Sequence, residues 1–194
     1  MKEFVDTLLP LCLVEGDHRA LWEAVWTAQR LSAKAYPSMS KMLVNLVGQS
    51  SGSFIHALTA GLTSVGEKHG PIAKARDDFL YYTEAQVTKE AVQRGIKIYG
   101  FGHSFYKRQT DPYWLQVHDI LRTHYAQTFE GIRQIQKGLQ EAGKNIYPNP
   151  AGYSAAAANA TGLLRGMEEI IFVLPRMQIW LEEYVITQTV KAGG

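Results

Sequence analysis

The chain of 194 residues has little cysteine and no long apolar run. Its single cysteine, Cys12, cannot form an internal disulfide, which favours a reducing compartment. The most apolar stretch near the start, residues 8–14, contains Pro10 and is too short to span a membrane. Glu15 and Asp17 follow it, where a signal peptide would carry small residues for cleavage. We therefore expect a cytoplasmic protein that does not associate with a membrane.

An excess of charge of either sign is also missing. The chain has 20 basic and 18 acidic residues, with a formal net charge of +2. Nucleic-acid-binding proteins normally show a clear basic excess, so we expect no nucleic-acid partner. An apolar content of 46% and a charged content of 20% are ordinary for a globular protein. The length is sufficient for one domain, or for two small ones.

No metal-ligand motif stands out. No two histidines have the His-x-x-x-His spacing, and one cysteine provides no ligand cluster. We therefore predict no metal, with a helical metal-binding protein as a minor alternative. Its ligands would come from His56, His69, His103, His118 and His124. Nucleotide binding through Gly100-x-Gly102 is weaker still, because position 105 is Phe and no βαβ unit surrounds it.

Apolar residues recur at helical spacing through most of the chain, which predicts an all-α fold. A short apolar segment, residues 96–99, has the length of a strand, but no second strand is available to pair with it. In the last and longest helix Pro175 removes one backbone hydrogen bond and should produce a kink. The expected helices are 3–14, 18–35, 38–47, 54–62, 72–82, 84–94, 113–125, 129–140, 154–160 and 163–185.

Two loops each place one histidine among glycines. His69 lies in the segment 66–71, and His103 lies in the segment 100–107, which continues to Asp111-Pro112. Glycine neighbours have no side chains to cover the histidine, and they allow the loop backbone conformations that other residues rarely adopt. Either loop alone is ordinary, since Gly and His are common at surface turns. Together they predict two imidazoles presented to one cleft.

These loops resemble the catalytic-histidine loops of citrate synthases, P-x-H-G-G-A and G-x-G-H-x-x-x-K-x-x-D-P-R. Residues 148–154 resemble the family's P-N-V-D-F-Y-S block, and residues 171–180 its F-A-x-A-R-x-x-G-W helix. The match covers roughly residues 40–183 and corresponds to the C-terminal half or so of a typical member. It implies a citrate-synthase-like, two-lobed helical fold, truncated at the N-terminal side. Residues 1–66 and 163–194 would form a larger, dimer-forming lobe, and residues 67–162 a smaller lobe carrying His103.

The resemblance also implies a reaction, the Claisen condensation of an acyl-CoA with a ketone acceptor. In that scheme His69 stabilises the enol of the acyl-CoA and His103 polarises the acceptor carbonyl. Arg176 would bind an acceptor carboxylate, and Lys107 would contact the CoA phosphates. Asn149 and Tyr153 match the block that carries the catalytic aspartate and are expected to help bind substrate. Coenzyme A or an acyl-CoA is the expected substrate, together with a carboxylate-bearing acceptor.

Several positions depart from the family pattern. The catalytic aspartate is replaced by Ala151, whose methyl group cannot act as a base. The arginine of D-P-R is Tyr113, and the upstream acceptor histidine is missing from residues 33–36. Ile179 and Glu183 replace the Gly and His of G-W-x-x-H, and no arginine follows near the C-terminus. These losses argue against the usual recognition of oxaloacetate.

Two hypotheses follow. In the first, the chain is an acyltransferase or a citryl-CoA lyase-like enzyme with an altered acceptor, and Glu67, Asp77, Tyr153 or water supplies the base. In the second, it is a non-catalytic homologue that binds acyl-CoA, or a regulatory or structural partner of a fuller synthase subunit. In either case we expect a homodimer formed by the long helices, because the last helix and the small residues of segment 54–62 exceed what half a domain can bury.

Overall fold

The computed structural model describes residues 16–66, 69–107 and 109–192, with side chains described up to Thr189. The helix expected over 3–14 and the candidate base Glu67 lie outside these residues. The all-α prediction is confirmed, because the described part contains helices and only two isolated β-bridges. The helices are α2 (Arg19–Ala35), α3 (Met39–Ser51), α4 (Phe54–Thr63), α5 (Ile72–Tyr81), α6 (Ala85–Gln93), η2 (Pro112–Trp114), α7 (Leu115–His124), α8 (Ala126–Glu141), α9 (Pro150–Ala160) and α10 (Glu168–Ala192).

The two largest differences from the predicted helix starts are at α9 and α10, and α8 also begins three residues earlier than expected, at Ala126. Helix α9 starts at Pro150 instead of Ser154, because the Asn149 side chain accepts a hydrogen bond from the Gly152 amide and caps the helix. Helix α10 starts at Glu168, five residues later than expected. Gly166 precedes it with a φ of +87°, which is not a helical conformation. Residues 96–99 form a loop, so no strand is present there.

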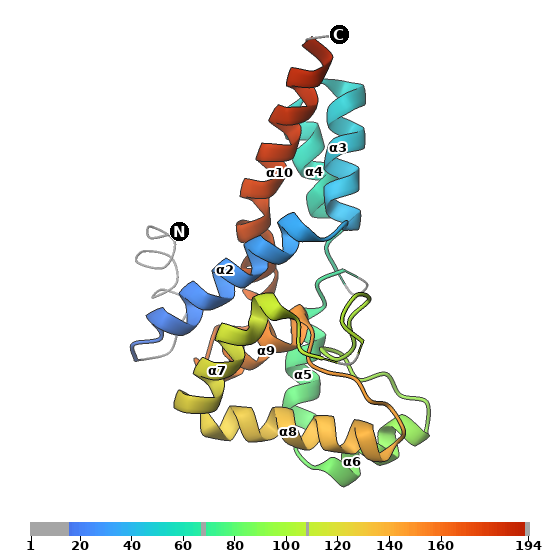
Figure 1. Cartoon of the computed structure of the whole chain (residues 1–194), viewed down its shortest axis with the longest axis vertical. Helices are drawn as coiled ribbons and strands as arrows, with labels where there is room; N and C mark the ends of the chain where they lie inside the picture. Colours follow the sequence, from blue (N-terminus) through green and yellow to red (C-terminus); the bar gives the residue numbers. More distant parts are fainter. Residues whose placement is uncertain (1–15, 67–68, 108, 193–194) are drawn as a thin grey trace.

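The helices form two groups (Figure 1). Helices α3, α4 and α10 lie side by side in the upper part, and α5, α7, α8 and α9 form the lower part, with α6 at its base. Helix α2 crosses between them and contacts α10 as well as α7 and α9. In the upper group Val44, Ala57 and Trp180 form a small separate core. The division into two lobes remains a prediction.

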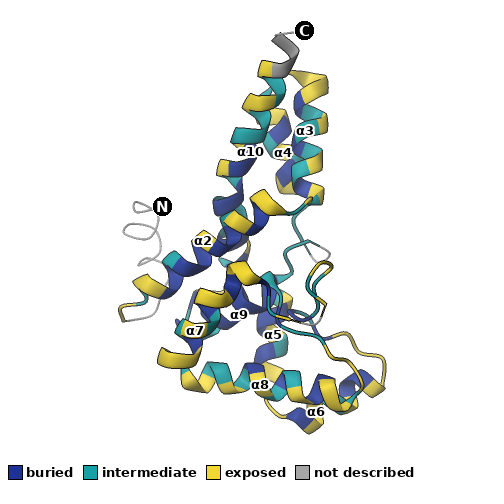
Figure 2. Cartoon of the chain, in the orientation of Figure 1, coloured by how far each residue is buried: buried dark blue, intermediate teal, exposed yellow. Residues whose placement is uncertain are grey.

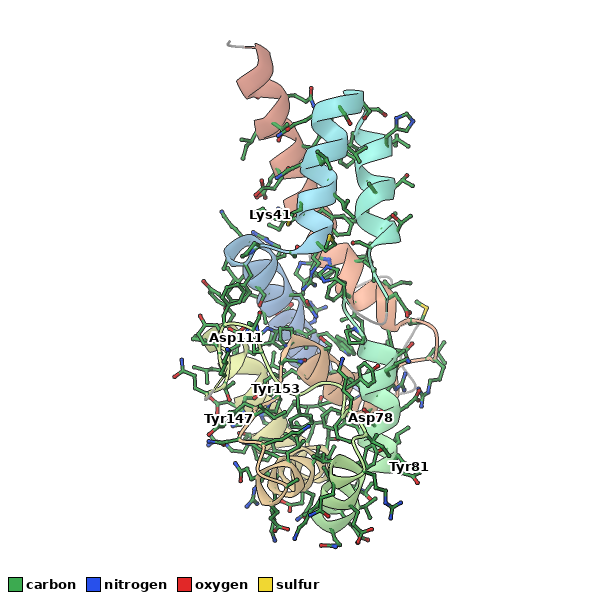
Figure 3. All side chains as sticks on the ribbon, turned by 90° about the vertical axis from the view of Figure 1, so that its right-hand side faces the viewer. Lys41, Asp78, Tyr81, Asp111, Tyr147 and Tyr153 are labelled. Carbon is green, nitrogen blue, oxygen red and sulfur yellow. The ribbon has the colours of Figure 1, made fainter. Side chains whose placement is uncertain are left out.

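Helix α9 is the centre of the main core. Residues 151–158 are all buried, so every face of this helix meets protein (Figure 2). Its alanines have small side chains, which allows α2, α5, α7 and α8 to approach closely. Figure 3 shows Tyr153 of this helix inside the lower group, where its ring stacks on Trp114 at 5.8 Å between centroids.

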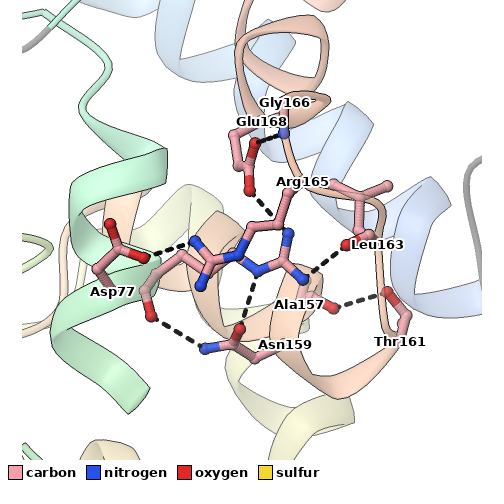
Figure 4. A network of polar contacts seen from close by, with 9 residues as sticks. Asp77, Ala157, Asn159, Thr161, Leu163, Arg165, Gly166 and Glu168 are labelled. Atoms are coloured by element: carbon pink, nitrogen blue, oxygen red, sulfur yellow. Dashed lines mark hydrogen bonds and ion pairs between the residues drawn. The ribbon is translucent and has the colours of Figure 1, made fainter. Parts of the chain in front are cut away.

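A buried ion pair fixes the start of α10 (Figure 4). Arg76 Nη1 on α5 lies 2.7 Å from Glu168 Oε1, and both side chains are almost fully buried. The same guanidinium donates to Asn159 Oδ1 at 3.0 Å and to the Leu163 carbonyl at 2.6 Å. The arginine therefore holds together α5, the end of α9 and the loop that leads to α10.

Candidate active site

The His69 loop packs against α10. The backbone amide and carbonyl of His69 pair with those of Gly66 at 3.0 and 2.9 Å. Gly70 follows with a φ of +81°, and a Cβ at this position would lie 2.8 Å from the Phe172 ring. Glycine is therefore required there on two counts, backbone conformation and space. The His69 ring meets the Phe172 ring edge-on, with 5.1 Å between the centroids.

His69 is held as a neutral imidazole. Its Nε2 lies 3.0 Å from Oγ of Ser40, which is fully buried in the first turn of α3. Burial, and secondarily the charge of Arg176, lower the pKa of His69 from 6.5 to about 4. At neutral pH the ring is therefore uncharged and still able to donate one hydrogen bond.

His103 is oriented by its own loop. Its Nδ1 accepts hydrogen bonds from the amides of Phe105 (3.0 Å) and Tyr106 (3.2 Å), so the neutral ring carries its proton on Nε2. That nitrogen lies 3.5 Å from Asp111 Oδ2, too far for a strong hydrogen bond. Burial lowers the pKa of His103, and the nearby Asp111 carboxylate opposes this shift.

Asp111 is a site residue for which the sequence analysis proposed no role. Its side chain is buried, and Oδ1 accepts from the Tyr36 hydroxyl at 3.1 Å and from the Tyr113 amide at 3.0 Å. Oδ2 has no hydrogen-bond partner among the described residues. The signal was present in the sequence, since Asp111-Pro112 ends the His103 motif. The carboxylate of Asp111 lies in the lower group of helices, level with the crossing of α2 (Figure 3).

The start of α9 is fastened to the His103 loop. Asn149 Nδ2 donates to the Gly102 carbonyl at 2.8 Å, and the Asn149 amide donates to the Gly100 carbonyl at 2.9 Å. A Cβ on Gly152 would lie only 2.1 Å from the Gly100 oxygen. The two segments can meet this closely only because the residues at the contact, Gly100 and Gly152, have no side chain. This contact places Ala151, in the position of the missing aspartate, beside the His103 loop.

Arg176 is a buried cation without a carboxylate partner among the described residues. Its Nη1 donates to Gln29 Oε1 and, at 2.9 Å, to the Phe172 carbonyl. The guanidinium carbon lies 3.4 Å from the centre of the Phe172 ring. Nε is buried and has no hydrogen-bond partner in the described part of the chain. Burial lowers the pKa of Arg176 to about 9, so the side chain remains charged at neutral pH.

These groups meet at a cavity of about 240 Å³, which we call the inner cavity. It brings together His69, His103, Asn149 and Arg176, four of the residues predicted from the sequence. It also brings Ala151 into its wall. The residues that complete the wall are Ser32, Ala33, Tyr36, Pro37, Ser38, Gly70, Pro71, Gly102, Ser104, Phe105, Pro150 and Phe172.

A second cavity of about 640 Å³, the outer cavity, adjoins the first. The two share Pro71, Asn149 and the segment 102–104 in their walls. Lys97 and Lys107 line the outer cavity, and both lysines are exposed. Lys97 Nζ lies 4.4 Å from the centre of the Tyr99 ring, which also lines this cavity. Lys97 is a second residue that the sequence analysis did not single out.

Two candidate bases are not brought to the inner cavity. Asp77 is exposed and pairs with Arg165 at 2.5 Å. Tyr153 is fully buried, and its hydroxyl lies 3.0 Å from His118 Nδ1. Burial raises the pKa of Tyr153 to about 12, so it keeps its proton at neutral pH. Tyr153 therefore supports the start of α9 from within the core and does not line either cavity.

The chain matches the family model "Citrate synthase, C-terminal domain" over residues 33–189. The chain belongs to the citrate synthase family. This confirms the family predicted from the four sequence blocks. No curated protein sequence matches the chain.

Three solved structures show the same fold. Citryl-CoA lyase from Hydrogenobacter thermophilus superimposes with a TM-score of 0.79 at 18% identity, over 96% of this chain and 75% of that protein. Citrate synthase from Thermotoga maritima MSB8 superimposes with a TM-score of 0.75 at 19% identity, over 89% of this chain and 49% of that protein. ATP citrate lyase from Methanothrix soehngenii, in complex with citrate and coenzyme A, superimposes with a TM-score of 0.74 at 17% identity, over 89% of this chain and 32% of that protein. The chain thus spans about half of that citrate synthase and a third of that ATP citrate lyase.

No three His, Cys, Asp or Glu side chains of the described residues lie close enough to share a metal ion. No described helix combines the length and the apolar character needed to cross a bilayer.

Proposed function

We propose that the chain binds an acyl-CoA thioester and forms or breaks a carbon–carbon bond next to the thioester carbonyl. The observation that carries this proposal is the inner cavity, where two neutral histidines and a buried arginine meet. The family and the solved structures support it, since one of them is a citryl-CoA lyase and another holds citrate and coenzyme A.

The outer cavity is proposed to hold the CoA portion. Lys107 and Lys97 carry the positive charge that phosphate groups require. The shared wall at Gly102 and His103 is where the thioester would pass from the outer to the inner cavity. The outer cavity is the larger of the two, as expected for the larger part of the substrate.

The histidines then have separate tasks. If the Ser40 hydroxyl donates to His69 Nε2, Nδ1 carries the proton of the ring and can donate to the enol oxygen. His103 carries its proton on Nε2, because Nδ1 is occupied by two backbone amides. This proton is proposed to polarise the carbonyl of the acceptor. Arg176 would hold the carboxylate of the acceptor through the edge that contains Nε.

The base is the weakest part of this site. No described residue that lines the inner cavity has a carboxylate, and Ala151 occupies the position expected for one. Glu67 and water remain the candidates of the sequence analysis. A general base contributes roughly 10²–10⁴-fold to the rate, so a slow reaction is expected. Ala151 is also the observation that favours the second hypothesis, a non-catalytic homologue that binds acyl-CoA or serves a synthase subunit.

We further propose a homodimer formed through α3, α4 and α10, in a cytoplasmic protein. The described residues of this group of helices expose eight large apolar side chains, and an exposed apolar surface of this kind is typical of an interaction site. Light scattering on the purified protein should give twice the monomer mass of 21.7 kDa. The exposed side chains are Met39, Met42, Leu46, Ile55, Leu62, Leu181, Val185 and Ile186.

Calorimetric titration with CoA and acetyl-CoA tests the proposal. We expect saturable binding that weakens about two- to fivefold in Lys107→Ala, since one lysine–phosphate contact at an exposed site is worth roughly 0.5–1 kcal/mol. Lys137→Ala is the matched control, because Lys137 is an exposed lysine that lines neither cavity. Absence of binding to a folded protein would overturn the proposal.

Turnover separates the two hypotheses. Cleavage of citryl-type thioesters into acetyl-CoA and a 2-oxo acid, followed by chromatography of the acetyl-CoA formed, should be slow in the natural chain and faster in Ala151→Asp. His69→Ala should abolish it, whereas His56→Ala, on the exposed surface of α4, should not. A protein that binds CoA but shows no turnover in either the natural chain or Ala151→Asp would support the non-catalytic homologue.

A further inference from the structure

We propose that the inner cavity selects an acceptor with one carboxylate and an apolar remainder. The carboxylate would bind Arg176, and the remainder would lie against the rings of Tyr36 and Phe105. This inference rests on the proposed function, because it names the class of acceptor that the same site would take. Three independent features of the cavity lead to it.

The first feature is the charge of the wall. Among the described residues that line the inner cavity, Arg176 is the one that carries a permanent charge. The two histidines in the wall are neutral at pH 7, because burial lowers the pKa of both. A second carboxylate in the same ligand would therefore lose its hydration without gaining a cationic partner, and such a transfer is costly in a buried site.

The second feature is the free edge of Arg176. Nη1 uses its hydrogens on Gln29 and on the Phe172 carbonyl. Nε has no partner in the described part of the chain, although the side chain is only 6% exposed. An unpaired buried cation is unfavourable, and the Nε side of a guanidinium matches a carboxylate with two parallel hydrogen bonds. The arginine is thus equipped for one carboxylate.

The third feature is the aromatic wall formed by Tyr36 and Phe105. Their rings stack at 4.9 Å with an interplanar angle of 18°, and both line the inner cavity. The Tyr36 hydroxyl donates to Asp111 Oδ1, so its hydrogen is not available to an anion in the cavity. The Asp111 carboxylate behind this wall would also repel a second negative charge. This part of the cavity therefore favours an apolar group.

The size of the cavity sets a limit on the acceptor. A volume of about 240 Å³ lies below the range of about 300–1,000 Å³ that is common for larger organic ligands. A short 2-oxo acid fits this limit and supplies the carbonyl that His103 would polarise. The probe pair is 2-oxobutyrate and oxaloacetate, which differ only in a terminal methyl group or carboxylate.

Calorimetric titration of the full chain with each acid, with and without saturating CoA, tests the inference. We expect 2-oxobutyrate to bind at least tenfold more tightly than oxaloacetate. Arg176→Gln should weaken 2-oxobutyrate binding tenfold or more. Arg176→Lys keeps the charge but not the paired hydrogen bonds, so its affinity for 2-oxobutyrate should lie between those of the natural chain and Arg176→Gln. Arg165→Gln is the control, since Arg165 is a half-exposed arginine outside both cavities. Circular dichroism confirms that each variant is folded.

A second variant tests the aromatic wall. Asp111→Asn removes the negative charge but keeps an oxygen for the Tyr36 hydroxyl, and it should lower the preference for 2-oxobutyrate at least threefold. Equal or tighter binding of oxaloacetate by the natural chain would overturn the inference, as would no binding of either acid. If 2-oxobutyrate binds and its binding depends on Arg176 while CoA does not bind, the inferred acceptor site is supported and the acyl-CoA proposal is wrong.

Discussion

Gly152→Ala should destabilise the protein and damage the site, and its cost can be worked out from one contact. The new Cβ would lie 2.1 Å from the Gly100 carbonyl oxygen, more than 1 Å inside the usual contact of about 3.5 Å between heavy atoms. The position of the Cβ is fixed by the backbone of α9 and the Gly100 oxygen is itself a backbone atom, so no side-chain rotation can relieve the clash. The substitution must therefore separate the first turn of α9 from the His103 loop.

That separation loses the two hydrogen bonds from Asn149 to Gly100 and Gly102. At about 1 kcal/mol for each bond and about 1–3 kcal/mol for overpacking, the free energy of unfolding should fall by about 3–5 kcal/mol. Urea denaturation followed by circular dichroism measures this change. The folded fraction should also bind CoA and 2-oxobutyrate more weakly, because the wall shared by the two cavities has moved.

Two matched substitutions separate stability from site geometry. A Cβ on Gly138 would lie 2.3 Å from the Ala85 carbonyl, between α8 and α6, so Gly138→Ala should destabilise the protein without weakening binding by its folded fraction. Gly131 lies on α8 with no atom near its added Cβ, so Gly131→Ala should stabilise by about 0.5–1 kcal/mol. A Gly152→Ala protein within 0.5 kcal/mol of the natural chain would refute this reasoning.

The remaining predictions concern buried polar groups. Glu168→Gln leaves Arg76 as an unpaired buried cation and should cost about 3–5 kcal/mol in urea denaturation. Gln29→Leu removes one of the two acceptors of Arg176 Nη1 and should lower stability by about 1–3 kcal/mol; unchanged stability would mean that this contact is dispensable. Because the pKa of His69 is about 4 in the folded chain and 6.5 when unfolded, the unfolded state binds the extra proton between these values. The contribution of His69 to the free energy of unfolding is therefore fully present above pH 6.5 and is lost as the pH falls toward 4, by roughly 1–2 kcal/mol once partial exposure is considered. His69→Ala should reduce the dependence of the free energy of unfolding on pH in this range.

Most helices and the family could be predicted from the amino-acid sequence alone. The apolar periodicity predicts most helices of the described part, and the start of α3 is correct because Ser38 caps it through the Lys41 amide. The two histidine loops were recognisable because their glycines are local requirements of the backbone. The start of α10 was misplaced, since residues 163–167 continue the apolar pattern and only the positive φ of Gly166 ends it.

The assembly of the site depends on packing between distant segments and could not be predicted from the sequence. Arg176 and His69 are more than 100 residues apart, and only the packing of α10 on the His69 loop shows that they share a cavity. The proton of His103 lies on Nε2 because of its contacts with the following amides, which no spacing rule reveals. Asp111 and Lys97 gained a possible role for the same reason: burial, charge and distance between side chains are properties of the folded chain, whereas periodicity and capping are properties of the sequence.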